Sequence, residues 1–158
     1  MKPLIVLLVV FVLCLLIRRF KKERLMLSFA GRLAMTFMMI FSAVGHFVFT
    51  DGMAMMMPDF IPYREGVVYF SGVLEIGFAL GLLINRLNLV ASWTLIVFFI
   101  LVLPANIYAS IHHIDLQTAT DSGYGIEYLW FRVPLQVVFI TWVYIFGIFL
   151  PKKESKLG

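Results

Sequence analysis

The chain consists mainly of five long apolar runs, and the charged residues gather in the segments between them. A helix needs about 20 largely apolar residues to cross a bilayer, and the runs approach or reach this length. They predict membrane-spanning helices at about residues 3–17, 26–50, 66–84, 87–111 and 128–150. We therefore expect an all-α, polytopic membrane protein that is embedded in a lipid bilayer.

Most of the basic residues near the first apolar run come after it. Lys2 alone precedes it, whereas a basic cluster comes directly after it, at Arg18, Arg19, Lys21, Lys22 and Arg24. A cleavable signal peptide carries its positive charge first and ends in small residues. We interpret the run as a retained transmembrane anchor. The predicted organisation is an anchor with a basic connection, residues 1–25, and a four-helix bundle with a short tail, residues 26–158.

Basic residues fall on one side of the membrane when the connections are assigned to alternate sides. This side receives the cluster after the first run, Arg86, and the lysines of the tail. The other side receives most of the acidic residues, at Asp51, Asp59, Asp115, Asp121 and Glu127. Because loops rich in lysine and arginine stay in the cytoplasm, the N-terminus is predicted to be outside and the C-terminus inside.

The connections differ in length. The link between the third and fourth runs, at Asn85 and Arg86, is so short that these helices must form a tight hairpin. Residues 51–65 and 112–127 form outer connections that are long for a bundle of this size. The first of them is rich in methionine and contains two prolines, so we interpret it as an apolar lid over the mouth of the bundle.

Small residues recur within the spans and predict where helices approach closely. They include Gly31, Ala34, Ser42, Ala43, Gly45, Gly72, Gly77, Ala79 and Gly81. Helices in lipid associate through close packing more than through the hydrophobic effect. We expect these residues to lie between helices.

Composition excludes several functional classes. Of 158 residues, 62% are hydrophobic and 14% are charged, and the mean hydropathy is +0.98, which excludes a water-soluble domain. The net charge of +4 is explained by the basic residues that flank the spans, so nucleic acid is not an expected partner. With Cys14 as its single cysteine, the chain has neither a disulfide nor a CxxC motif, and no metal site is predicted.

Six polar residues from four spans form a predicted layer in the outer half of the membrane. At about 1.5 Å of rise per residue, they lie roughly 6 to 13 Å below the outer helix ends. They are His46, Ser71, Glu75, Asn106, Arg132 and Gln136. Ionisable groups at this depth are costly and usually face the bundle interior, so this layer is the candidate ligand site. The pattern of polar residues does not identify catalytic residues.

Two interpretations of this layer stay open. Glu75 and Arg132 are the natural ion pair, because a guanidinium can bind a carboxylate through two hydrogen bonds. The pair either locks two helices together or lines a polar pocket with His46 and Asn106. His46 is either a proton carrier or ligand, or a residue bonded to a backbone carbonyl. Arg32, near the cytoplasmic end of its span, is interpreted as a snorkelling interface residue.

Several short motifs occur in a characteristic order. They are Gly45-His46-Phe47, the loop with Pro58 and Pro62, Ser71-Gly72-Val73-Leu74-Glu75, Pro104-Ala105-Asn106-Ile107 and Arg132-Val133-Pro134-Leu135-Gln136. With this set, residues 28–150 resemble the DoxX-like family of small bacterial membrane proteins. The resemblance implies a four-helix unit in the bacterial cytoplasmic membrane, with shared polar positions at His46, Glu75, Asn106, Arg132 and Gln136.

The same resemblance implies an association with membrane oxidoreductases, because the family is named after subunits linked to a thiosulfate:quinone oxidoreductase. We expect an accessory subunit of a redox process that binds a quinone or similar small amphiphile, and not an enzyme on its own. One alternative is a non-enzymatic transporter or binding protein for a small polar or anionic molecule. The other is a structural subunit that docks a membrane protein partner or a second copy of the chain.

Overall fold

The computed structural model describes residues 2–20, 26–58, 60–154 and 156, and within them no strand forms. The elements are α1 (Lys2–Phe20), α2 (Leu27–Val48), α3 (Thr50–Met55), α4 (Arg64–Leu83), α5 (Asn88–Ile111), the 3-10 helix η1 (Gly125–Tyr128), α6 (Leu129–Val143), the π-helix η2 (Tyr144–Phe149) and α7 (Leu150–Glu154). Five helical runs are long and apolar enough to cross a membrane: α1, α2, α4, α5 and Gly125–Glu154. The predicted all-α chain with five such runs is confirmed.

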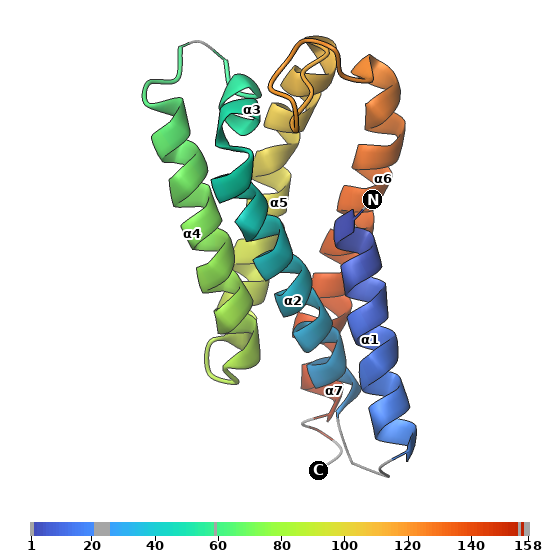
Figure 1. The fold of residues 1–158 in the computed structure, drawn as a ribbon. Coiled ribbons are helices and arrows are strands. Elements are labelled where there is room, and N and C mark those ends of the chain that lie inside the picture. Colours follow the sequence, from blue (N-terminus) through green and yellow to red (C-terminus); the bar gives the residue numbers. More distant parts are fainter. Residues whose placement is uncertain (1, 21–25, 59, 155, 157–158) are drawn as a thin grey trace.

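The long helices run side by side and share two ends (Figure 1). We call the end that carries α3 and the 112–127 connection the loop end, and the end that carries α7 and the α4–α5 turn the tail end. Arg18, Arg19, Arg86, Lys152 and Lys153 all belong to tail-end segments. The described basic residues of these connections are therefore segregated as expected. Four residues used in the charge argument lie outside the described residues: Lys21, Lys22, Arg24 and Asp59.

The second span ends slightly earlier than predicted, and a short helix follows it. Phe49 leaves the helical conformation, with φ −118° and ψ 38°, and α3 then occupies residues expected to begin an outer loop. The Thr50 hydroxyl donates a hydrogen bond to the His46 carbonyl at 2.8 Å, which ties α3 to α2. A Cβ atom at Gly52 would lie only 2.1 Å from the Leu116 carbonyl oxygen, so α3 packs closely against the 112–127 connection.

Close contacts between helices depend on glycine at several of the predicted positions. A Cβ atom at Gly31 would lie 2.1 Å from Cγ of Phe146, and one at Gly72 would lie 2.8 Å from Cβ of His46. One at Gly81 would lie 2.9 Å from Cβ of Ala91. At Gly77 nothing lies within 4 Å, so the expectation of a close contact there was wrong. Glycine therefore sets the spacing of α2 from α4 and η2, and of α4 from α5.

Helix α1 packs against the rest of the bundle. Leu7 is fully buried, and the Phe11 ring meets the Trp142 ring edge-on with 4.8 Å between centroids. The indole N–H of the same Trp142 donates to the Gly31 carbonyl at 3.0 Å, which links α6 to α2. Apolar packing and one hydrogen bond therefore join α1, α2 and α6, and Leu7 belongs to the same core as Met35, Met38 and Met39 of α2.

Arg32 is buried instead of snorkelling. Its exposed fraction is 6%, and its Nη1 donates to the Leu82 carbonyl at 3.1 Å and to Asn85 Oδ1 at 3.5 Å. The interface interpretation was wrong because the carbonyls at the end of α4 lie within reach of this guanidinium. An unpaired carbonyl at a helix end is a strong acceptor, so Arg32 joins α2 to the last turn of α4.

We predict that Gly31→Ala destabilises the protein by about 1 to 3 kcal/mol, the usual range for an added methyl group in a packed core. The reason is the overlap of the new Cβ atom with the Phe146 ring. Gly77→Ala is the matched control, because its Cβ atom meets nothing and alanine favours a helix by about 0.5–1 kcal/mol over glycine. Thermal or denaturant unfolding in mild detergent measures both. Equal losses for the two variants would contradict the packing described here.

Candidate functional site

The predicted polar layer divides into two clusters on different helix interfaces. His46, Ser71 and Glu75 meet between α2 and α4, whereas Asn106 and Arg132 meet between α5 and α6. Gln136 joins neither cluster, because its amide donates to the Phe99 carbonyl on α5. Four helices contribute polar groups as expected, but they do not form one site.

In the first cluster, the His46 ring connects the two helices. Its Nε2 lies 3.2 Å from Glu75 Oε1, and its Nδ1 lies 3.1 Å from the Val68 carbonyl oxygen and 2.9 Å from Ser71 Oγ. Both side chains are largely buried, with 13% of His46 and 7% of Glu75 exposed. Gly72 permits this arrangement, because any larger residue there would collide with the histidine. The cluster fixes both the spacing and the register of α2 and α4.

The second cluster holds the guanidinium of Arg132. Its Nε donates to Asn106 Oδ1 at 3.0 Å, and its Nη1 donates to the Tyr128 hydroxyl at 3.4 Å. The guanidinium carbon also lies 5.7 Å from the centroid of the Tyr128 ring. Asn106 is buried and donates in turn to the Val102 carbonyl at 3.1 Å, one helical turn earlier. The amide therefore holds its oxygen toward Arg132.

The expected ion pair between Glu75 and Arg132 is not formed. Glu75 pairs with His46, and Arg132 forms no ion pair within the described part of the chain. The physical reason is the rotation of the two helices about their axes. The face of α4 that carries Ser71 and Glu75 packs on α2 in the most extensive helix contact of the structure, while Arg132 faces α5.

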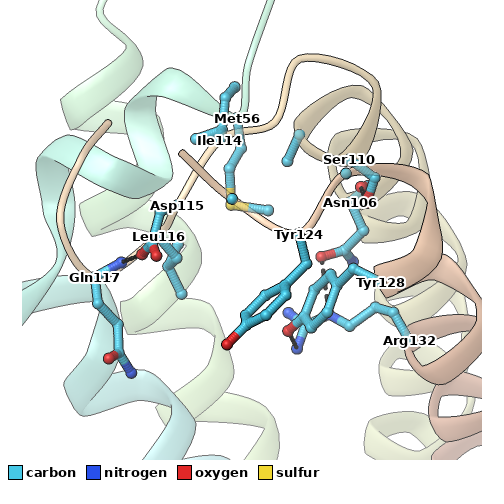
Figure 2. A pocket seen from close by; sticks show the side chains of 13 residues that line it. Met56, Asn106, Ser110, Ile114, Asp115, Leu116, Gln117, Tyr124, Tyr128 and Arg132 are labelled. Carbon is cyan, nitrogen blue, oxygen red and sulfur yellow. Dashed lines mark hydrogen bonds between the residues drawn. The ribbon is translucent and has the colours of Figure 1, made fainter. Parts of the chain in front are cut away.

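A cavity of about 280 Å³ opens beside Arg132 at the loop end. Its wall comes from the end of α5, η1, the start of α6, the 112–127 connection and Met56. Figure 2 shows Arg132, Tyr128 and Asn106 on one side of it and Asp115 and Gln117 on the other. Of the predicted site residues, Asn106 and Arg132 line this cavity, whereas His46, Ser71, Glu75 and Gln136 do not.

Sequence reasoning missed several residues that line the cavity, among them Ser110, Asp115, Tyr124 and Tyr128. Met56 belongs to the methionine-rich connection that was expected to lie over the mouth of the bundle. For Tyr128 a signal was present, because it lies four residues before Arg132 and so on the same helix face. Asp115 and Tyr124 come from the connection, where no periodicity predicts which side chains turn inward.

The 112–127 connection is held by its own hydrogen bonds. The Asp115 N–H donates to the Thr120 carbonyl at 2.7 Å, and Asp115 Oδ1 accepts from the Gln117 N–H at 2.7 Å. Gly125 adopts φ +66°, and a Cβ atom there would lie 2.4 Å from the His113 ring. Glycine is the residue that takes this left-handed conformation without strain. The rim of the cavity is therefore built by compact local structure.

We predict that His46 and Glu75 are energetically coupled and that Glu75 and Arg132 are not. Residues in contact show coupling of about 0.5–3 kcal/mol in a double-mutant cycle, whereas separate residues are additive within about 0.5 kcal/mol. The cycles use His46→Gln with Glu75→Gln, and Arg132→Gln with Glu75→Gln as the matched control. The measurement is the free energy of unfolding in detergent or bicelles. Stronger coupling of Glu75 to Arg132 would overturn the assignment of partners.

Comparison with curated proteins and with solved structures finds no significant match. A family model does match, over residues 35–147, and its description is a domain of unknown function, DUF8561. The matched region begins within α2 and ends within η2, so it includes both polar clusters and the cavity and leaves out α1. Because the match extends over most of its length, the chain belongs to the DUF8561 family.

Proposed function

We propose that the protein is a membrane-embedded binding protein for a small amphiphile with an anionic head group, which occupies the cavity beside Arg132. The observation that carries this proposal is the guanidinium of Arg132, which lines the cavity and has no carboxylate partner among the described residues. A cation at membrane depth is costly unless it is paired. An anionic ligand would supply the missing charge.

The hydrogen bonds of Arg132 leave its Nη2 group available to bind a ligand. Nε is used by Asn106 and Nη1 by Tyr128, whereas Nη2 donates no hydrogen bond within the described residues. Two neutral partners thus orient the guanidinium without neutralising it. Charged hydrogen bonds of this kind are among the strongest that a protein makes, so the free Nη2 can bind an anionic or carbonyl oxygen.

The size of the cavity and its surroundings support an amphiphile. Drug-sized ligands occupy pockets of about 300–1,000 Å³, so about 280 Å³ suits a head group better than a whole molecule. The apolar part would lie against Met56 and the ring of Tyr124, which line the cavity, and Tyr124 is 84% exposed. Tyrosine is favoured at membrane interfaces because it has an apolar ring and a polar hydroxyl group.

The redox role expected from the DoxX-like resemblance is a more specific form of this proposal. The carbonyl oxygens of a quinone could accept a hydrogen bond from Arg132 Nη2 in the same way. His46 and Glu75, which were expected to share this site, line a different interface, so a quinone at Arg132 would have no proton-transfer group from that pair beside it. The observations favour binding over catalysis.

Met56 at the cavity wall is consistent with the transport alternative, in which the methionine-rich segment acts as a gate.

We predict that Arg132→Gln weakens binding of dodecanoate by about 10- to 100-fold, since a charged hydrogen bond contributes about 1.5–3 kcal/mol. Native mass spectrometry in mild detergent measures the bound fraction, with dodecanol as the uncharged probe and a short-chain quinone as the redox probe. Arg86→Gln at the exposed tail-end turn is the matched control and should bind like the wild type. Equal binding of dodecanoate by wild type and Arg132→Gln would refute the proposal. Preference for the quinone would favour the redox form.

The proposal includes an orientation, with the loop end outside the bacterial cytoplasmic membrane and the tail end inside. The basic residues of the tail-end segments support this orientation. In a Cys14→Ser background, a cysteine at exposed Tyr124 should react with a membrane-impermeant maleimide in intact cells. A cysteine at Arg86 should react only after lysis. The reverse pattern would invert the orientation and place the cavity on the cytoplasmic side.

A further inference from the structure

The contact between His46 and Glu75 lies outside the cavity and contains a buried polar atom with no partner. Glu75 Oε1 faces His46 Nε2, but Oε2 of the same carboxyl group has no hydrogen-bond partner within the described residues. An unsatisfied buried oxygen is destabilising, and an ionised carboxylate in apolar surroundings is more so. The surroundings of Glu75 must therefore offset the energetic cost of burying this carboxyl group.

The hydrogen bonds around the ring assign one proton to Nδ1 of His46. Ser71 Oγ donates its own proton to the Val68 carbonyl at 2.8 Å, so both groups near Nδ1 can act as acceptors. Nδ1 lies 3.1 Å from the Val68 carbonyl oxygen and 2.9 Å from Ser71 Oγ, and it therefore carries a hydrogen. This assignment follows from the hydrogen-bond network, as it does for most histidines.

A second proton is then required between His46 and Glu75. With Nδ1 protonated, a neutral ring presents a bare Nε2, and an ionised Glu75 would present a bare Oε1 at 3.2 Å. Two acceptors would face each other in a buried site, which costs energy instead of gaining it. A proton on either atom converts this repulsion into a hydrogen bond. With the proton the pair is neutral overall, and without it the pair carries a net charge of −1.

Among the described residues, no other positive charge contacts this carboxyl group. Besides the pair, the titratable groups of the loop-end half on the packed elements are Lys2 of α1, Asp51 of α3, Arg64, Glu65 and Tyr69 of α4, Tyr108 of α5 and Arg132 of α6. Arg64, in the first turn of α4, donates to the Met57 carbonyl at 3.4 Å and lies about 16 Å along the helix from Glu75. Asp51, Glu65 and Tyr69 are exposed, and Arg132 is bonded to Asn106 and Tyr128. Arg32, the remaining cation of α2, bonds to the tail end of α4, roughly 21 Å along the helix from His46.

We propose that His46 and Glu75 form a proton-binding site between α2 and α4, which holds one proton between Nε2 and Oε1. His46 lies two residues before the end of α2, whereas Glu75 lies about 16 Å from the start of α4 by helical rise. The histidine therefore stands between the loop end and the deeper carboxyl group. Glu75 Oε2, which has no partner among the described residues, can accept a hydrogen bond from a further donor. This proposal does not depend on the ligand proposed for Arg132.

Nuclear magnetic resonance of the wild-type protein in detergent at neutral pH tests the proposal. The ¹⁵N shifts of the His46 ring report which nitrogen carries a proton, and the ¹³C shift of the Glu75 carboxyl reports its ionisation. His46→Gln assigns the ring signals against those of exposed His112 and His113. Either a doubly protonated ring beside an ionised carboxylate, or a neutral ring beside a carboxylic acid, is the expected result. A neutral ring beside an ionised carboxylate, whether the ring is protonated at Nδ1 or at Nε2, would overturn the proposal.

A pair of variants tests whether the shared proton belongs to this carboxyl group. Glu75→Gln should remove the signature of the shared proton from the His46 signals. Glu65→Gln, which changes an exposed glutamate on the same helix, should leave these signals unchanged. Loss of the signature in both variants, or in neither, would contradict the assignment. Should Glu75→Gln fail to fold, the protonation state of the wild-type pair still decides the proposal.

Discussion

Polar groups in apolar surroundings need hydrogen-bond partners, and at the interface between α2 and α4 they find these partners on the neighbouring helix. Arg32 donates to the Leu82 carbonyl, the Thr36 hydroxyl donates to the Ala79 carbonyl at 2.9 Å, and His46 reaches Glu75. These contacts occur along the length of one helix face. In lipid, where apolar surfaces gain little from meeting each other, such hydrogen bonds and close packing decide which helices associate.

This constraint also explains why the polar layer divides. The polar side chains of the layer bond to the helix that packs on their own face, so Glu75 is matched by His46 across the α2–α4 interface, and Asn106 by Arg132 across the α5–α6 interface. The result is one pair that can be neutral and one guanidinium that has no countercharge among the described residues. A neutral pair can remain buried, whereas an unmatched cation needs a ligand or solvent. The accessible cavity lies beside the cation, which agrees with this difference.

Much of the architecture could be predicted from the sequence, because the length and apolarity of a run are nearly sufficient to define a spanning helix. The hairpin at Asn85 and Arg86 and the close contacts at Gly31 and Gly72 could be predicted from the sequence. The same holds for the presence of six polar side chains that hydrogen-bond within the bundle. The partners of these side chains could not be predicted. Glu75 was assigned to Arg132 on chemical grounds, although the two residues lie on different interfaces. Arg32 was assigned to the membrane surface although it bonds to Leu82.

The sequence by itself determined the number of spans, the segregation of basic residues to one end and the residues able to carry chemistry. Only the tertiary structure decided which of them meet, and that η1, Met56 and the 112–127 connection form part of the wall of the cavity. The physical reason is that helices surrounded by lipid are apolar on most faces, so their hydrophobic pattern does not define their rotation about the axis. That rotation is set by hydrogen bonds and glycine contacts between residues far apart in the chain.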